Sequence, residues 1–355
     1  MRIVSDLRCY CKMRALVVLL AVLCVQLVRS SPLLREDDDN HEWHVAADED
    51  GNMRLVSYAM PYQLDGEKPR REFVPERDTR FLLYTASNPE VPHVITNGVL
   101  ESVLTSPFNA SNPTRVIIHG WLGTQNSEIN RLTRSALFFV GNYNVIYVDW
   151  SVGSLDDFYP NSRALVYAVG AATSNMLDYL GRYTQLNKRD VVVVGHSLGA
   201  HVAGNVGKWQ NGAIGTIIGL DPALPFFADN APDRIMASDA DYVEIIHTNG
   251  GVLGFMDPIG DADFYPNYGR IQPACGPDVG GSCAHARAVH FYVESILSRN
   301  GFIGRQCESF QNIRDGRCVE TGVTSRMGEP AKAAGAPTGI FFMETANGFP
   351  FAVGC

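Results

Sequence analysis

The sequence predicts an α/β protein in which helices cover both faces of a mostly parallel central sheet. From Phe73 onward, short apolar runs alternate with helical patterns, and this alternation is typical of right-handed crossovers between parallel strands. Residues 190–194, Asp-Val-Val-Val-Val, form a β-branched run of the kind that a parallel sheet buries on both faces. The sequence contains no internal repeat.

The individual elements follow from residue spacing. Short runs of β-branched or aromatic residues predict strands at 81–84, 115–119, 144–149, 190–194, 214–220, 242–247 and 339–343. Apolar residues at helical spacing predict helices at 161–182, 198–209 and 284–298. The glycine-rich residues 299–355 are too few for a second large domain, so we expect one globular domain over residues 73–355.

Composition excludes several classes of protein. The chain has 355 residues, of which 46% are hydrophobic and 19% charged, so collagen-like and wholly disordered proteins are excluded. The formal net charge of −9 argues against nucleic acid as the main partner, because phosphate binding needs a basic surface.

The N-terminus predicts secretion. Residues 15–28 are an apolar run that follows basic residues and precedes Ser30 and Ser31, which is the layout of a signal peptide over residues 1–30. The apolar run at 15–28 is short for a bilayer span, which favours a cleaved signal peptide over the alternative, an uncleaved membrane anchor. We expect no transmembrane segment elsewhere in the chain. Residues 31–72 are acidic without a sustained period and predict a flexible arm.

Cysteine usage agrees with an extracellular protein. Five cysteines follow the predicted signal peptide, namely Cys275, Cys283, Cys307, Cys318 and Cys355. Local pairing would join the first two and the next two, but the sequence alone leaves the connectivity open. The odd residue, Cys355, is free, pairs between chains or displaces one of these assignments. Asn109 begins an Asn-Ala-Ser sequon for glycosylation.

Residues 195–199, Gly-His-Ser-Leu-Gly, fit the pattern G-x-S-x-G between the apolar run and a helical stretch. In this context the pattern is typical of a nucleophile elbow, a tight turn that lifts a serine hydroxyl above the sheet. Gly195 and Gly199 are expected because side chains there would collide with backbone, and His196 completes the turn. Ser197 is the candidate nucleophile, at a helix N-terminus that favours negative charge. The alternative is a glycine-rich turn with an incidental serine.

A serine hydroxyl needs a base to take its proton, and the base needs an acid to orient it. In folds with this elbow, the acid ends the next strand and the histidine follows later in the chain. Asp221 directly follows the strand expected at 214–220 and is the candidate acid, with a turn-forming Asp-Pro as the alternative. Asp149 also ends a strand, but it precedes Ser197.

Four histidines lie downstream of the serine: His201, His247, His285 and His290. His201 is expected to face away from the cleft, His247 to pack structurally, and His290 to lie on the flank of its helix. His285 lies at a loop-to-helix junction two residues after Cys283, where a disulfide would hold the loop still. His285 is therefore the candidate base.

The carbonyl oxygen of an attacked ester becomes negative, so the site needs two N–H donors. We expect one from the amide of Leu198, directly after the nucleophile, and one from a loop after an early strand. Residues 119–122, His-Gly-Trp-Leu, form such a loop, and the Trp121 amide is the leading donor. Gly120 would allow close approach of the substrate, and His119 is interpreted as a brace for the loop.

These motifs resemble the animal pancreatic-lipase family over about residues 75–345. The similar segments are Val116–Trp121, Gly195–His201, Gly219–Ala223, Asp263–Asn267 and Cys283–Arg287. The resemblance implies an α/β-hydrolase fold with Ser197, Asp221 and His285 as the triad and Trp121 and Leu198 as the oxyanion hole. The spacing of the four cysteines from Cys275 to Cys318 is also similar to the spacing in that family.

The chain departs from the family pattern in three places. It ends too soon for the C-terminal β-sandwich of the vertebrate digestive members, so we expect neither that domain nor a colipase-type partner. Cys275 and Cys283 enclose only residues 276–282, which cannot form a long amphipathic lid. The loop at 249–261 also looks shortened. Within the family, a short lid (275–283) and a short neighbouring loop are similar to the phospholipase A1 members, including insect enzymes.

We therefore expect a secreted serine lipase that hydrolyses carboxylic esters of glycerolipids at a lipid–water interface through an acyl-enzyme. Phospholipase A1 activity is the first expectation, and triacylglycerol or galactolipid hydrolysis is the alternative. A catalytically silent, lipid-binding yolk-type protein is a rival of another class, but such proteins usually lose the triad, which is whole in this sequence. A general carboxylesterase is a second rival, and turnover of short soluble esters alone would favour it. We expect no cofactor and no metal.

Two groups of residues stay open at this point. Asp257, Asp261 and Asp263 are interpreted as loop chemistry, with a calcium site as the alternative. Phe226, Phe227, Phe255 and Met256 would form apolar rims around the site or else pack in the core.

Overall fold

The computed structural model describes residues 43–48, 53–57, 72–227, 231–278, 280–298, 300–332 and 334–353. The predicted signal peptide at residues 1–30 and Cys355 lie outside the described residues, as does most of the predicted arm. None of the helices in the described part of the chain has the length and apolarity that a bilayer crossing needs.

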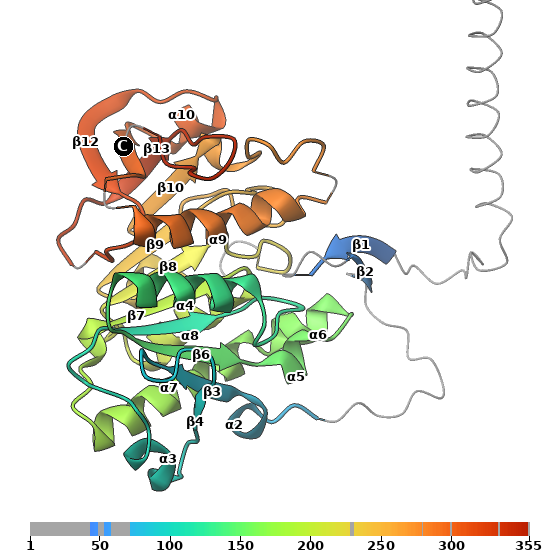
Figure 1. The fold of residues 1–355 in the computed structure, drawn as a ribbon. Coiled ribbons are helices and arrows are strands. Elements are labelled where there is room, and N and C mark those ends of the chain that lie inside the picture. Colours follow the sequence, from blue (N-terminus) through green and yellow to red (C-terminus); the bar gives the residue numbers. More distant parts are fainter. Residues whose placement is uncertain are drawn as a thin grey trace, which may run out of the picture. The chain divides into compact units, whose positions relative to one another are not determined.

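An eleven-stranded sheet forms the centre of the protein (Figure 1). Across the sheet the strands are β12 (Glu320–Arg326), β11 (Ile303–Cys307), β13 (Gly339–Met343), β10 (Ala262–Pro266), β9 (Tyr242–Ile246), β8 (Thr216–Leu220), β7 (Val191–His196), β5 (Thr114–Ile118), β6 (Asn144–Asp149), β3 (Arg80–Tyr84) and β4 (His93–Ile95). Every neighbouring pair from β13 to β6 is parallel. The remaining neighbouring pairs, at both edges of the sheet, are antiparallel. The predicted mostly parallel sheet is confirmed.

Four long helices cover the two faces of the sheet. Helices α7 (Val166–Tyr183) and α8 (Leu198–Trp209) pack on one face, and α4 (Glu128–Val140) and α9 (Ser282–Leu297) pack on the other (Figure 1). Strand β5 shows the alternation directly, because Val116 and Ile118 belong to the α7 and α8 core while Ile117 belongs to the other. Both cores are buried, so the sheet is covered on both faces as the Val191–Val194 run predicted.

Short elements connect these layers. They are α2 (Pro75–Asp78), α3 (Leu100–Leu104), α5 (Ser151–Ser154), α6 (Tyr159–Ala164), α10 (Phe310–Arg314) and the 3₁₀ turns η1 (Lys188–Asp190), η2 (Ala237–Asp239) and η3 (Asn267–Gly269). The single helix predicted over 161–182 is wrong in detail. The chain tightens at Leu165, whose amide bonds to the carbonyls of Ser162 and Arg163, and this turn separates α6 from α7.

Two short strands lie within the segment predicted to be an arm. Within residues 31–72, for which the sequence predicts a flexible arm, strands β1 (Trp43–Ala47) and β2 (Met53–Ser57) form an antiparallel two-stranded sheet. The apolar residues in these two short runs are compatible with strands, and the residues between them, Asp48-Glu-Asp-Gly-Asn52, are of the types that favour a turn. Arg54 donates to the carboxylate of Asp48 at 3.0 Å, which joins β2 to the residue that follows β1.

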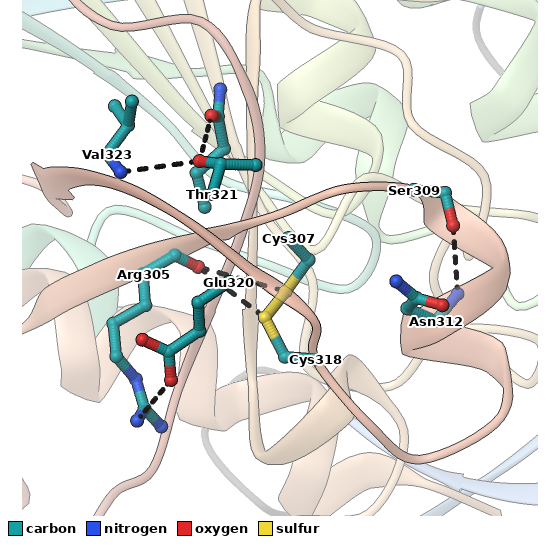
Figure 2. The surroundings of a disulfide bond; sticks show 9 residues. Arg305, Cys307, Ser309, Asn312, Cys318, Glu320, Thr321 and Val323 are labelled. Carbon is teal, nitrogen blue, oxygen red and sulfur yellow. Dashed lines mark hydrogen bonds and ion pairs between the residues drawn. A yellow bond between two sulfur atoms is a disulfide. The ribbon is translucent and has the colours of Figure 1, made fainter.

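Both predicted local disulfides are present. Cys275 pairs with Cys283 and Cys307 with Cys318. Figure 2 shows the second bridge, which closes the segment between β11 and β12 that contains α10. The first bridge closes the loop directly before α9.

A buried ion pair links the sheet to the C-terminal segment. Arg115 on β5 donates to both carboxylate oxygens of Glu329, at 2.7 and 3.0 Å, and both side chains are less than a tenth exposed. Burial alone would raise the pKa of Glu329, but the charge and hydrogen bonds of Arg115 outweigh it and lower the pKa. Tyr292 on α9 donates to the same carboxylate at 3.1 Å. The pair therefore joins three segments that lie far apart in sequence.

We expect Glu329→Gln to lower the free energy of unfolding by about 3–5 kcal/mol, because it leaves Arg115 as a buried cation without its counter-charge. Urea unfolding followed by circular dichroism measures the loss. The matched control is Glu320→Gln, which removes a charge from the exposed Arg305–Glu320 pair and should cost at most about 1 kcal/mol. Equal losses in the two variants would contradict this role for the buried pair.

Candidate active site

Ser197 lies in a strained turn between β7 and α8. Its φ of 56° and ψ of −122° are unusual for a residue with a side chain. A Cβ on Gly195 would lie 2.0 Å from the carbonyl oxygen of Gly199, and a Cβ on Gly199 would lie 2.3 Å from that of Ile118. The two glycines are thus sterically required, and the Ser197 amide bonds to the carbonyl of Leu220 at 3.0 Å, which ties the turn to β8.

Asp221 lies directly beyond β8 and is completely buried. One carboxylate oxygen accepts the backbone N–H groups of Thr248 and Asn249, at 2.7 and 3.0 Å. The other oxygen lies 2.6 Å from Nδ1 of His285. Because the carboxylate only accepts, this short contact places a proton on Nδ1 and leaves Nε2 as the basic nitrogen of His285.

His285 lies in the first turn of α9, as the sequence predicted for a loop-to-helix junction. Its amide bonds to the carbonyl of Gly281 at 2.9 Å. Nε2 of His196, the residue before Ser197, lies 3.2 Å from the His285 carbonyl oxygen, and the two rings lie 4.5 Å apart. The elbow and the first turn of α9 are therefore in direct contact, although their residues are nearly ninety positions apart.

The loop after β5 is braced by side chains. Nδ1 of His119 donates to the Gly120 carbonyl at 2.9 Å, and Nε2 accepts the Trp150 amide at 3.1 Å. The two ring nitrogens thus join the loop after β5 to the residue that follows β6. Indole Nε1 of Trp121 donates to the Asp156 carbonyl at 2.7 Å, which fixes the loop from its other side. Leu198 is the first residue of α8, so its amide has no acceptor within that helix.

The other candidate histidines and Asp149 have partners elsewhere. His201 is fully buried and faces the Ala223 carbonyl at 2.7 Å, and burial lowers its pKa to about 3. His290 lies 3.1 Å from Glu128 on α4. His247 faces Asp263 at 2.8 Å. Burial would raise the pKa of Asp149, but His119 and Ser151 outweigh this and lower it. Among the four described histidines downstream of Ser197, His285 is the one whose ring contacts the Asp221 carboxylate.

Of the four apolar residues expected either to form a rim around the site or to pack in the core, three are in the core and one is exposed. Phe227, Phe255 and Met256 are buried core residues, while Phe226 is 53% exposed. Phe226 stacks on Tyr159, whose ring in turn contacts Trp121 edge-on at a centroid distance of 5.0 Å. An aromatic row therefore runs outward from the loop after β5.

Sequence reasoning missed several residues that hold the site. Asp278, inside the disulfide loop, accepts the amides of Cys283 and Ala284 and so caps α9 next to His285. Gly254 lies against Asp221, since a Cβ there would be 2.4 Å from both carboxylate oxygens. Asp278 lies six residues before the start of the helix predicted at 284–298, and an aspartate shortly before a helix is a general signal for a cap. No local signal marks Gly254, because its neighbour is distant in sequence.

This arrangement is suited to nucleophilic catalysis. A hydroxyl, an imidazole held in one tautomer and a buried carboxylate come from the ends of β7 and β8 and the start of α9. The braced loop lies against the elbow, since a Cβ on Gly199 would be 2.6 Å from the carbonyl oxygen of His119. The predicted loop aspartates have protein partners: Asp263 faces His247, and Asp261 accepts the Val243 amide at 2.8 Å.

Comparison with known proteins agrees with this chemistry. The family model described as Lipase matches residues 61–351. Pancreatic lipase-related protein 2 of Cavia porcellus is 36% identical over 249 residues, covering 68% of this chain and 56% of that protein. Pancreatic triacylglycerol lipase of the same species is 34% identical, covering 76% and 64%, and Lipase member H of Oryctolagus cuniculus is 32% identical, covering 73% and 58%. The chain therefore spans little more than half the length of the first relatives it matches.

We expect Gly254→Ala to slow covalent labelling of Ser197 by a serine-directed organophosphonate by at least about 100-fold, because the new methyl group would displace the Asp221 carboxylate. Intact-protein mass spectrometry measures the labelling rate. Gly348→Ala, a position where a Cβ would have no neighbour within 4 Å, is the control. Equal labelling rates in both variants would show that the contact at Gly254 does not matter.

Proposed function

The chain belongs to the lipase family, and from this premise we propose that it hydrolyses carboxylic esters of glycerolipids through an acyl-enzyme on Ser197. The observation that carries the proposal is the 2.6 Å contact between Asp221 and Nδ1 of His285. This contact makes Nε2 of His285 the base, and Ser197 is the serine of the neighbouring elbow.

In the proposed reaction, His285 Nε2 takes the proton of the Ser197 hydroxyl while the serine oxygen attacks the acyl carbonyl. Asp221 holds the imidazole in its tautomer and stabilises the imidazolium that forms. His285 then gives the proton to the departing glycerol oxygen, and the lysolipid leaves. Water attacks the acyl-enzyme by the same route and releases a fatty acid.

We assign the oxyanion hole to the amides of Trp121 and Leu198. The negative charge would develop on the carbonyl oxygen only in the tetrahedral intermediate, so rigid donors contribute most when they need no rearrangement. The His119, Trp150 and Asp156 contacts described above give the Trp121 loop that rigidity. The chemistry requires no cofactor and no metal.

We favour phospholipids as substrates because of the small loop before α9. The Cys275–Cys283 bridge encloses seven residues, and the side chain of Asp278 among them is committed to capping α9. A loop of this size cannot cover the site with a long apolar surface. A polar head group could then approach Ser197 without displacing an apolar lid. Phospholipase A1 activity requires this access.

Triacylglycerol hydrolysis is the second candidate, and it is favoured by the relatives named triacylglycerol lipase.

We also propose that the protein is secreted after loss of residues 1–30, that it works at a lipid–water interface without colipase, and that Asn109 is glycosylated. Asn109 is exposed, and its carboxamide oxygen accepts the Ser111 amide at 3.0 Å within the sequon. Two disulfides agree with an oxidising compartment.

We expect Ser197→Ala to lower ester hydrolysis by about 10⁶-fold, because no other group on the turn can form the acyl-enzyme. Release of fatty acid from phosphatidylcholine in mixed micelles measures the activity. Ser135→Ala, an exposed serine on α4, is the matched control and should keep full activity. Residual hydrolysis in Ser197→Ala close to the wild-type rate would overturn the proposed mechanism.

We further expect a preference for phosphatidylcholine over a neutral triglyceride of the same acyl chains, of at least about tenfold or 1.4 kcal/mol. Both lipids are presented in the same detergent micelles, and released fatty acid is quantified by titration. A preference for the triglyceride would contradict the short-lid argument while leaving ester hydrolysis intact. Turnover of short soluble esters alone would indicate a general carboxylesterase.

A further inference from the structure

His247, the residue directly after β9, has an unusual set of neighbours for a buried imidazole. Nδ1 lies 2.7 Å from the carbonyl oxygen of Phe255, and Nε2 lies 2.8 Å from a carboxylate oxygen of Asp263. The ring is completely buried and stacks on Tyr265, with centroids 4.4 Å apart and planes within 2° of parallel. A carbonyl oxygen and an ionised carboxylate oxygen carry no hydrogen to donate, so opposite an ionised Asp263 both ring nitrogens must donate.

A neutral imidazole has only one N–H group, and one of its nitrogens would then point a lone pair at an oxygen. The two short contacts are therefore satisfied only by an imidazolium, which forms a buried ion pair with Asp263. The same Asp263 carboxylate also accepts hydrogen bonds from the backbone N–H groups of Ile259 and Gly260. These bonds stabilise its negative charge. Tyr265 is the other titratable group against the ring, and burial and the charge of Asp263 raise its pKa, so the phenol stays neutral.

The contact with Phe255 closes a loop around Asp221. His247 and Phe255 are the ends of a nine-residue segment, and the Phe255 amide bonds to the Pro222 carbonyl at 2.9 Å. Inside this loop, the amides of Thr248 and Asn249 hold one oxygen of Asp221. Gly254, also inside it, lies against the same carboxylate, as described above. The ring of His247 thus fastens the two ends of the segment that surrounds the proposed catalytic acid.

We propose that His247 is a positioning residue for the hydrolytic reaction, acting as a doubly donating clamp between Phe255 and Asp263 that keeps the 247–255 loop closed around Asp221. This inference rests on the proposed function for its kinetic consequence, but the double donation itself does not. His247 contacts neither the substrate nor the reacting atoms in this role. It acts through the amides that hold Asp221, and Asp221 in turn orients His285.

The first test is spectroscopic and uses the wild-type protein. With ¹⁵N-labelled histidine, two-bond ¹H–¹⁵N correlation spectra separate rings with two N–H groups from neutral rings, and the His247 signals are assigned by their loss in His247→Asn. We expect both nitrogens of His247 to be protonated at the pH of the activity assay. One protonated and one bare nitrogen would overturn the proposal.

The second test separates the two contacts. An asparagine amide lies near the position of Nδ1 and can still donate to Phe255, while a glutamine amide reaches toward the position of Nε2 and Asp263. We expect His247→Gln to lower kcat for a soluble ester by about 100-fold with KM little changed, because the loop opens around Asp221. His247→Asn should lose clearly less activity. Equal losses in the two variants, or a change confined to KM, would contradict the clamp.

A matched variant controls for general loss of stability. Leu177→Ala removes a fully buried side chain from α7 and should lower the melting temperature without lowering kcat at a temperature where the protein is folded. If His247→Gln does not fold, the wild-type spectrum and His247→Asn still decide the proposal. If wild-type protein hydrolyses no ester, the proposed function fails, and the spectrum alone then decides whether His247 donates from both nitrogens.

Discussion

The site depends on the burial of one negative charge. Asp221 has no exposed surface, and an ionised carboxylate in such a position is costly unless each oxygen receives hydrogen bonds. Two backbone amides donate hydrogen bonds to one carboxylate oxygen, and the imidazole of His285 donates to the other. The carboxylate is therefore compensated only when the segment after β9 and the start of α9 are both in place.

The topology of the sheet brings the parts of the site together. In a parallel sheet the carboxyl ends of neighbouring strands meet at one edge, and β5, β7, β8 and β9 are consecutive neighbours. Ser197 and Asp221 both have positive φ, at 56° and 41°, which costs free energy for residues with side chains. Their amides bond to the carbonyls of Leu220 and Ile246 on the next strand. The sheet therefore holds both strained residues in register.

The sequence predicted most strands of the parallel block, although it missed the buried strand β10, and it predicted the edges less well. The strands β7, β8 and β13 are buried β-branched or aromatic runs, and the glycines of the elbow have steric causes that a motif reveals. Helix α4 escaped prediction because half of its buried face is polar, including Asn130, Thr133 and Arg134. The edge strands β4 and β12 are short or largely exposed, so they have no strong hydrophobic period. Residues such as Gly254 and Asp263 act through partners that only the three-dimensional structure brings near.

The proposed base, His285, is held by short-range closures rather than by long ones. The Cys275–Cys283 bridge spans eight positions, the Asp278 cap five and six, and together they fix the first turn of α9, where His285 lies. Short loops lose little entropy when they close, so this part of the site is inexpensive to order. Asp221, in contrast, depends on contacts with a segment more than twenty-five residues away, for which no covalent link substitutes. In our proposal, His247 closes that segment by donating hydrogen bonds from both ring nitrogens, as the disulfide closes the loop before His285. Asp221 and His285, which contact one another, are therefore held in place by different chemistry.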